Sequence, residues 1–200
     1  MRRRALATAL ALALVAPAAR GAEPVRWSVA NEARMAAEAA SWAPPDFKRQ
    51  LAKHSRRLMQ GVSDAAAAET GTRSAAAHRA AAARGARSLA EAIRRHTAFD
   101  DVVYQAGGIV HEFALALPPQ GGAAPDVSKT ARFLGYPAEP FAAPEILAAA
   151  PLPATTARER YDGAVTLSTR LLAWIWKAAG GDASSVTRYP ASKGPYAVRE

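Results

Sequence analysis

Alanine is the residue that most constrains how this chain folds, because it supplies 53 of the 200 residues. Alanine has the highest helix propensity of the amino acids, and its small side chain lets helices pack closely. Apolar residues recur three and four positions apart through most of the sequence, which is the spacing of one helix face. No segment shows the apolar alternation of a strand. The sequence therefore predicts an all-α protein that forms a single helical bundle.

Five main helices are expected, and local signals mark several of their ends. Gly61 is a stop signal after the second helix. Thr97 with Asp100 provides an acidic variant of the capping box before the fourth helix, and Thr156 with Glu159 provides a true capping box before the last one. The expected helices span residues 27–41, 45–59, 73–95, 97–117 and 156–179.

The segments between these helices carry weaker signals. We expect a loop over residues 62–71, a short helix over residues 127–134 and a single turn over residues 145–149. The last of the main helices is apolar on all sides, which is typical of a helix in the middle of a bundle. We therefore expect a buried, central C-terminal helix.

The start of the chain has the features of a secretory signal peptide. Three arginines follow Met1, an almost entirely apolar run covers residues 5–16, and two possible cleavage sites lie at residues 16–18 and 19–21. These features predict a signal peptide over residues 1–21, a helical domain over 22–181 and a flexible tail over 182–200. The expected protein is exported, either periplasmic or secreted. No later segment reaches the roughly 18 apolar residues that span a bilayer, so no transmembrane segment is expected.

The composition limits the chemistry of the chain. It contains no cysteine, which excludes disulfides and cysteine-ligated metals. The formal net charge is +9, which suits a phosphate-ester substrate or anionic lipid as a partner, although a charge surplus also serves solubility alone. The sequence has no specific nucleic-acid motif, no nucleophile elbow, no phosphate-binding glycine loop and no His-Glu-x-x-His zinc motif.

The four histidines lie on or beside the apolar faces of the expected helices: His54, His78, His96 and His111. A buried histidine needs a partner, since an unpaired buried polar group costs about 1–3 kcal/mol. His78 and His111 are expected to converge at one end of the bundle with Asp64 from the preceding loop. Two imidazoles and a carboxylate are suitable zinc ligands. The alternative is that each histidine is a core residue satisfied by its own neighbours.

The order of these features resembles the exported zinc-dependent phospholipase C and single-strand nuclease superfamily. Trp27 stands near the expected mature start, and residues 51–64 resemble a helix that leads into a glycine and a metal-binding aspartate. His78 follows, residues 107–118 resemble the central zinc-binding helix that ends in proline, and residues 165–181 resemble a late helix. The resemblance implies an all-α fold, hydrolysis of phosphodiester bonds, and zinc held by Asp64, His78 and His111.

The chain also departs from the superfamily pattern and is identified as a degenerate member. Ala114 and Leu115 occupy the neighbourhood where the family carries an aspartate, and no histidine follows His111. Asn31 and Glu32 lie where the family has an early histidine. The resemblance thus implies at most one zinc ion.

Three functions follow as alternatives. The first is an exported metal-dependent hydrolase of phosphodiester bonds, phospholipase C-like or nuclease-like, with a reduced metal site and with Arg79 steadying the substrate. The second is a non-catalytic helical envelope or partner-binding protein on the same fold. The third is an unrelated periplasmic bundle in which the histidines are core residues.

Overall fold

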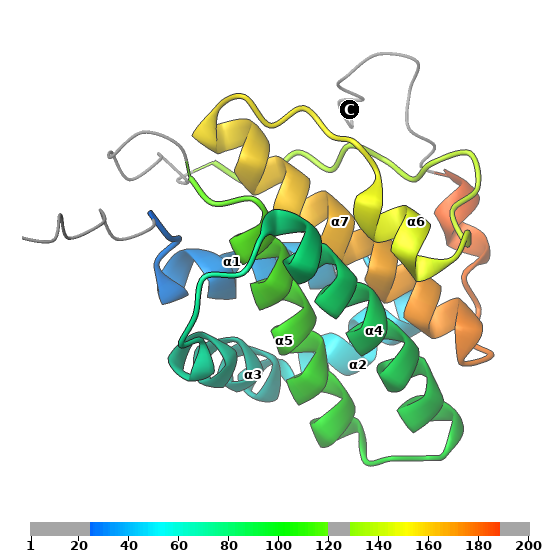
Figure 1. The fold of residues 1–200 in the computed structure, drawn as a ribbon. Coiled ribbons are helices and arrows are strands. Elements are labelled where there is room, and N and C mark those ends of the chain that lie inside the picture. Colours follow the sequence, from blue (N-terminus) through cyan, green and yellow to red (C-terminus); the bar gives the residue numbers. More distant parts are fainter. Residues whose placement is uncertain (1–24, 120–128, 189–200) are drawn as a thin grey trace, which may run out of the picture.

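The computed structural model describes residues 25–119 and 129–188. In these residues the chain forms seven α-helices, one short 3-10 helix and no strand, and the helices pack into one bundle (Figure 1). The predicted all-α fold is therefore confirmed, while the predicted signal peptide lies outside the described residues. The helices are α1 (Val29–Ser41), α2 (Pro45–Lys53), α3 (Ser55–Ala68), α4 (Ala75–Arg94), α5 (Phe99–Ala116), α6 (Pro144–Ala149) and α7 (Ala157–Ala178), followed by η1 (Ser184–Arg188).

Helix α7 is the buried centre of the bundle, as its sequence predicts. Every residue from Tyr161 to Ala173 is buried, and the helix packs against α1, α4, α5 and α6. The predicted capping box is present, because the Thr156 side chain accepts from the backbone N–H of Glu159 while the Glu159 side chain accepts from that of Thr156. This cap satisfies backbone donors that would otherwise be unpaired at the helix start.

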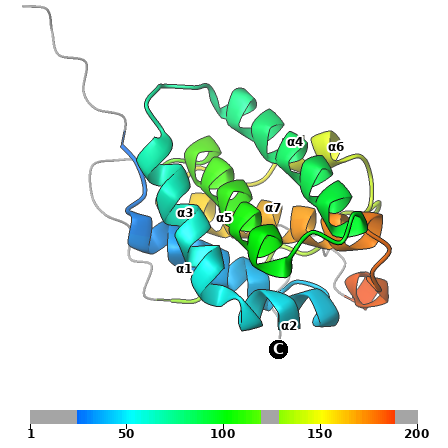
Figure 2. The ribbon, with the colours of Figure 1, turned by 90° about the horizontal axis from the view of Figure 1, so that it is seen from below.

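Helix α5 lies between α3 and α4 (Figures 1 and 2). Its contact with α3 is a close approach of two backbones at Gly61 and Gly107. A Cβ atom at Gly61 would lie 1.9 Å from the Tyr104 carbonyl oxygen, and one at Gly107 would lie 2.4 Å from the Leu58 carbonyl oxygen. Only glycine fits at either position, because no real Cβ makes contacts this short.

The helix predicted over residues 45–59 is wrong in two respects: it is interrupted, and it ends later than expected. The chain breaks at His54, between α2 and α3, and α3 then continues through Gly61 to Ala68. Gly61 is required by the crossing with α5 and therefore sits inside a helix. Consequently Asp64 lies on α3 and not in a loop.

The turn between α4 and α5 also differs from the prediction. His96 adopts a left-handed backbone conformation with φ 58°, and the Thr97 backbone N–H donates to the end of α4. These are the features of a helix C-terminal motif, so Thr97 closes α4 and does not cap α5. The residue before α5 is Ala98, which has no side-chain cap.

The segment from residue 129 to residue 135 contains no helix, so the helix predicted over 127–134 is wrong wherever the structure describes it. Two of its backbone N–H groups donate to side chains of α7: that of Arg132 to Asp162 and that of Leu134 to Thr166. The turn predicted at residues 145–149 is confirmed as α6. Within the predicted tail, residues 184–188 form η1, and residues 189–200 lie outside the described part.

Candidate functional site

The first histidine centre joins α5 to α1. His111 Nδ1 donates to the Glu32 carboxylate at 2.7 Å, and both side chains are about 96% removed from solvent, at 4% and 3% exposed. Glu32 reaches this position because it shares the inner face of α1 with Met35 and Ala36, three and four residues later. The other ring nitrogen, His111 Nε2, is buried without a hydrogen-bond partner in residues 25–119 and 129–188.

The second centre joins α4 to α5. His78 Nδ1 donates to the Glu112 carboxylate at 2.7 Å, and His78 is 5% exposed. Arg73 bridges Glu112, at 3.1 Å, and Glu69, at 2.5 Å. The hydrogen bond from Arg73 is the main cause that lowers the pKa of Glu69 below its ordinary value. Two carboxylates, one guanidinium and one imidazole thus form a connected network.

A small pocket of about 120 Å³ opens beside this network. His78 and Arg73 line it together with Arg26, and Leu115 of α5 closes one side. Arg73 is paired with two carboxylates, whereas Arg26 donates to the Gly71 carbonyl oxygen at 3.3 Å.

The third predicted ligand, Asp64, is exposed on α3 and has partners of its own. Its carboxylate accepts a hydrogen bond from the Tyr104 hydroxyl at 3.1 Å and a longer one from Gln60 at 3.5 Å. The guanidinium of Arg57 lies over the Tyr104 ring, 4.8 Å from its centroid. Asp64 therefore belongs to the surface contact between α3 and the first half of α5.

The structure does not bring Asp64, His78 and His111 together. Tyr104, which holds Asp64, is seven residues before His111 on α5, a rise of about 10 Å. His111 and Glu112 are adjacent, so their side chains leave the helix about 100° apart. Within the described ranges, no group of three or more histidine, aspartate or glutamate side chains is arranged to hold a metal ion. Zinc binding by Asp64, His78 and His111 therefore stays a prediction.

The other two histidines lie apart from these pairs. His54 Nδ1 donates to Asp100 at the break between α2 and α3, and His96 is exposed in the turn after α4. Arg79, predicted to steady a substrate beside the zinc ligands, instead donates to the backbone of Ala148 and Ala150 around the end of α6.

Sequence reasoning missed the two carboxylates that hold the buried histidines. Glu32 carried a usable signal, since a glutamate at helical spacing from Met35, Ala36 and Ala39 is placed among core residues and needs a partner. Glu112 carried a weaker one, because it is adjacent to His111 and on a less buried face of α5.

Comparisons with known protein families, with curated proteins and with solved structures found no match to this chain. The resemblance to the phospholipase C and nuclease superfamily therefore rests on the sequence features alone. In the part of the chain that the structure describes, none of the helices combines the length and the apolar character needed to cross a membrane.

Proposed function

We propose that this chain is an exported, non-catalytic helical protein in which the histidines that resemble metal ligands form structural hydrogen-bonded pairs with glutamates. One observation carries the proposal: each buried histidine, His78 and His111, donates its Nδ1 hydrogen to a glutamate at 2.7 Å. Asp64 supports the proposal further, because its carboxylate accepts a hydrogen bond from the Tyr104 hydroxyl and thus has a partner other than the two histidines.

The two pairs have a clear structural role. Glu32 with His111 links α1 to α5, and Glu112 with His78 links α5 to α4. Removing one partner of a buried hydrogen-bonded pair costs about 1–3 kcal/mol, and more where the remaining group is charged, because that group is left unsatisfied. In a chain whose core is rich in alanine, such pairs fix which helices lie side by side. The function that remains for the bundle is to bind a ligand or a partner protein.

The metal-dependent hydrolase is the alternative, and one specific observation favours it. A metal-ligating histidine usually donates one ring N–H to a carboxylate, which orients the other nitrogen toward the metal. His111 has this arrangement, with Nδ1 held by Glu32 and Nε2 buried without a partner in the described part of the chain. Among the residues that the structure describes, no further ligands join His111 in a group of three that could hold a metal ion.

Zinc content and phosphodiester cleavage separate the two functions. The purified protein is dialysed against zinc, its bound metal is measured by elemental analysis, and its turnover of bis(p-nitrophenyl) phosphate is followed with and without chelator. We expect less than about 0.1 zinc per chain and no chelator-sensitive turnover. His96→Ala serves as the matched control for His111→Ala, since His96 is exposed and outside both pairs.

Stoichiometric zinc together with turnover that His111→Ala abolishes and His96→Ala retains would overturn the proposal. Zinc bound without any turnover would keep the protein non-catalytic but contradict the structural role of His111. Unfolding of His111→Ala in the absence of zinc, with His96→Ala stable, would support the structural role directly.

A further inference from the structure

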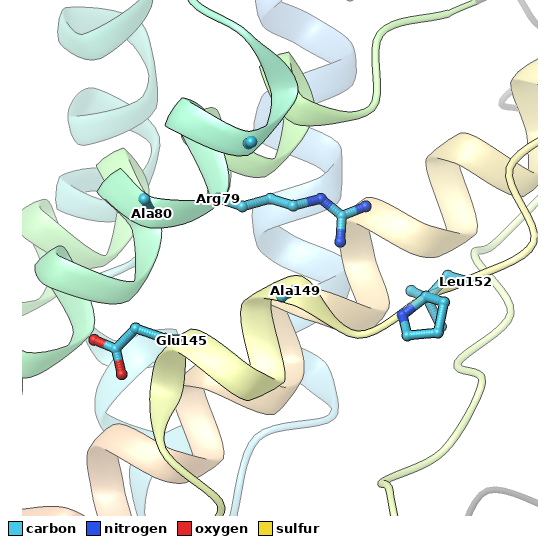
Figure 3. Close-up of a pocket in the computed structure, with 7 residues that line it drawn as sticks. Arg79, Ala80, Glu145, Ala149 and Leu152 are labelled. Atoms are coloured by element: carbon cyan, nitrogen blue, oxygen red, sulfur yellow. The ribbon is translucent and has the colours of Figure 1, made fainter.

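A pocket of about 480 Å³ lies between α4 and α6, apart from the histidine pairs (Figure 3). Its volume falls within the roughly 300–1,000 Å³ range of small-molecule sites. Small or apolar side chains form most of its wall: Ala76, Ala80, Ala149, Pro151 and Leu152. The pocket therefore offers an apolar surface to the body of a small ligand.

Arg79 brings a positive charge into this pocket. Its side chain extends from α4 toward the end of α6 (Figure 3), and Nη1 donates to the carbonyl oxygens of Ala148 at 2.9 Å and Ala150 at 3.2 Å. Arg79 is half-buried, and its burial lowers the pKa of the guanidinium below its usual value. In residues 25–119 and 129–188 no carboxylate pairs with Arg79, and its Nε and Nη2 groups have no hydrogen-bond partner.

Glu145 lines the same pocket, but its charge is already balanced. Arg87 donates to both carboxylate oxygens, from Nε at 2.8 Å and from Nη2 at 2.6 Å. The hydrogen bonds from Arg87 lower the pKa of Glu145 to about 2. Figure 3 shows Glu145 at the opposite side of the pocket from the Arg79 guanidinium. Among the described residues that line the pocket, Arg79 therefore carries a positive charge that no carboxylate balances.

We propose that this pocket binds a small organic anion, with a carboxylate or phosphate monoester at Arg79 and an apolar body against the alanine and leucine wall. A guanidinium has planar donors that match the oxygens of both groups, and such charge-assisted bonds are stronger than neutral ones. Capping of α6 explains only the Nη1 contacts, whereas an oxyanion also accounts for Nε and Nη2. The inference goes beyond the proposed function and holds whether or not His111 binds metal.

Isothermal titration of the purified protein with four probes tests the ligand chemistry. Octanoate and octyl phosphate carry the anion and the apolar body, octylamine carries the same body with a positive charge, and inorganic phosphate carries the anion alone. We expect one site for the two octyl anions, with octylamine and inorganic phosphate binding at least about tenfold more weakly. A preference between the two octyl anions would support the site and identify its head group.

Three variants test the location. Arg79→Gln is expected to weaken octanoate binding by about tenfold, which corresponds to about 1.4 kcal/mol. Arg84→Gln is the matched control, because it removes the same charge from an exposed position of the same helix that does not line the pocket. We expect it to weaken octanoate binding by less than about twofold. Ala80→Leu fills the pocket from an exposed helix position and is expected to weaken binding as much as Arg79→Gln.

Three outcomes would overturn the inference. Equal binding of octanoate and octylamine would mean adsorption to apolar surface without an anion site. Equal losses in Arg79→Gln and Arg84→Gln would mean diffuse attraction by the basic surface. Unchanged binding in a folded Ala80→Leu protein would place the ligand elsewhere. If Arg79→Gln does not fold, as judged by its helical circular dichroism, the Ala80→Leu result alone decides.

Discussion

The two sides of α4 differ at His78 and Arg79 in whether a glutamate pairs with the basic side chain. On the side facing α5, His78 is buried and paired with Glu112 at 2.7 Å. The next residue, Arg79, points to the side facing α6 and pairs with no carboxylate in the part of the chain that the structure describes. Consecutive helix residues point about 100° apart, so neighbours in sequence enter separate environments.

Packing differs between these sides in the same sense. Toward α5 the fit is tight, and a Cβ atom at Gly85 would lie only 3.2 Å from Ile109 Cγ1. Toward α6 the structure leaves a pocket of about 480 Å³. The comparison indicates that the contacts of α5 with α4, α1 and α3, together called the α5 side below, hold the bundle together. The α6 side of α4 leaves room for a ligand. The predictions below test whether stability and binding divide in this way.

Glu32→Ala should have the largest effect on the α5 side. It leaves the His111 ring buried without its carboxylate partner, and we expect the free energy of unfolding to fall by about 3 kcal/mol. Urea unfolding measures the change. The control is Glu91→Ala, which removes a half-exposed partner of Arg94 and should cost less than about 1 kcal/mol. Similar losses in the two variants would contradict the structural role of the pair.

Gly107→Ala should have the next largest effect. The new Cβ meets the Leu58 carbonyl oxygen at 2.4 Å, so α3 and α5 must separate, at a cost of about 1–3 kcal/mol or more. Gly108→Ala is the control on the adjacent residue. Nothing lies within 4 Å of a Cβ there, so the higher helix propensity of alanine should raise stability by about 0.5–1 kcal/mol. Opposite signs in the thermal or urea midpoints would confirm the contrast.

Arg79→Met should have a smaller effect on stability than either change on the α5 side. The variant keeps the aliphatic stem but removes the bonds to Ala148 and Ala150, whose carbonyl groups lie next to the pocket and can be hydrated. We expect a loss of about 1 kcal/mol in urea unfolding. A loss as large as that of Glu32→Ala would show that the α6 side is as important for stability as the α5 side.

The titration of Glu145 should show the smallest effect. Arg87 lowers the pKa of its carboxyl to about 2, so the pair contributes fully above the ordinary value of 4.5 and is lost as the pH falls through about 2. NMR titration of the side-chain carbonyl should therefore find a midpoint near 2. Arg87→Gln should return it toward 4.5, whereas Arg84→Gln should leave it unchanged. A midpoint near 4.5 in the unmodified protein would mean that Glu145 is not neutralised by Arg87.

Local signals predicted much of the fold because they act within one turn of chain. The capping box of Thr156 and Glu159 predicts the start of α7. The apolar residues on all sides of this helix predict its position at the centre of the bundle. Both conclusions follow from residues that are neighbours in sequence.

Local signals were misleading at positions where tertiary contacts decide the structure. Gly61 is a helix stop in isolation, but here it lies inside α3 because the Tyr104 carbonyl occupies the space of a side chain. The actual break at His54 has neither glycine nor proline to mark it. Thr97 looked like a cap for α5, yet its backbone closes α4.

The candidate site followed the same division. Helical spacing placed all four histidines on or beside apolar faces; the structure buries His78 and His111 but leaves His96 exposed. The partners of the two buried histidines were not predictable, because Glu32 lies 79 residues from His111 and Glu112 lies 34 residues from His78. The convergence of Asp64 with the histidines depended on a loop that is in fact a helix.

The contact between Gly61 and Gly107 has a consequence for how this protein can diverge. Each glycine is enclosed by the other helix's backbone, so neither position tolerates the smallest side chain while its counterpart stays in place. Substitution is therefore excluded at both glycines, even where charged residues around them can change. We therefore expect descendants of this chain, whatever ligand they take, to retain the two glycines together as a lasting mark of common ancestry.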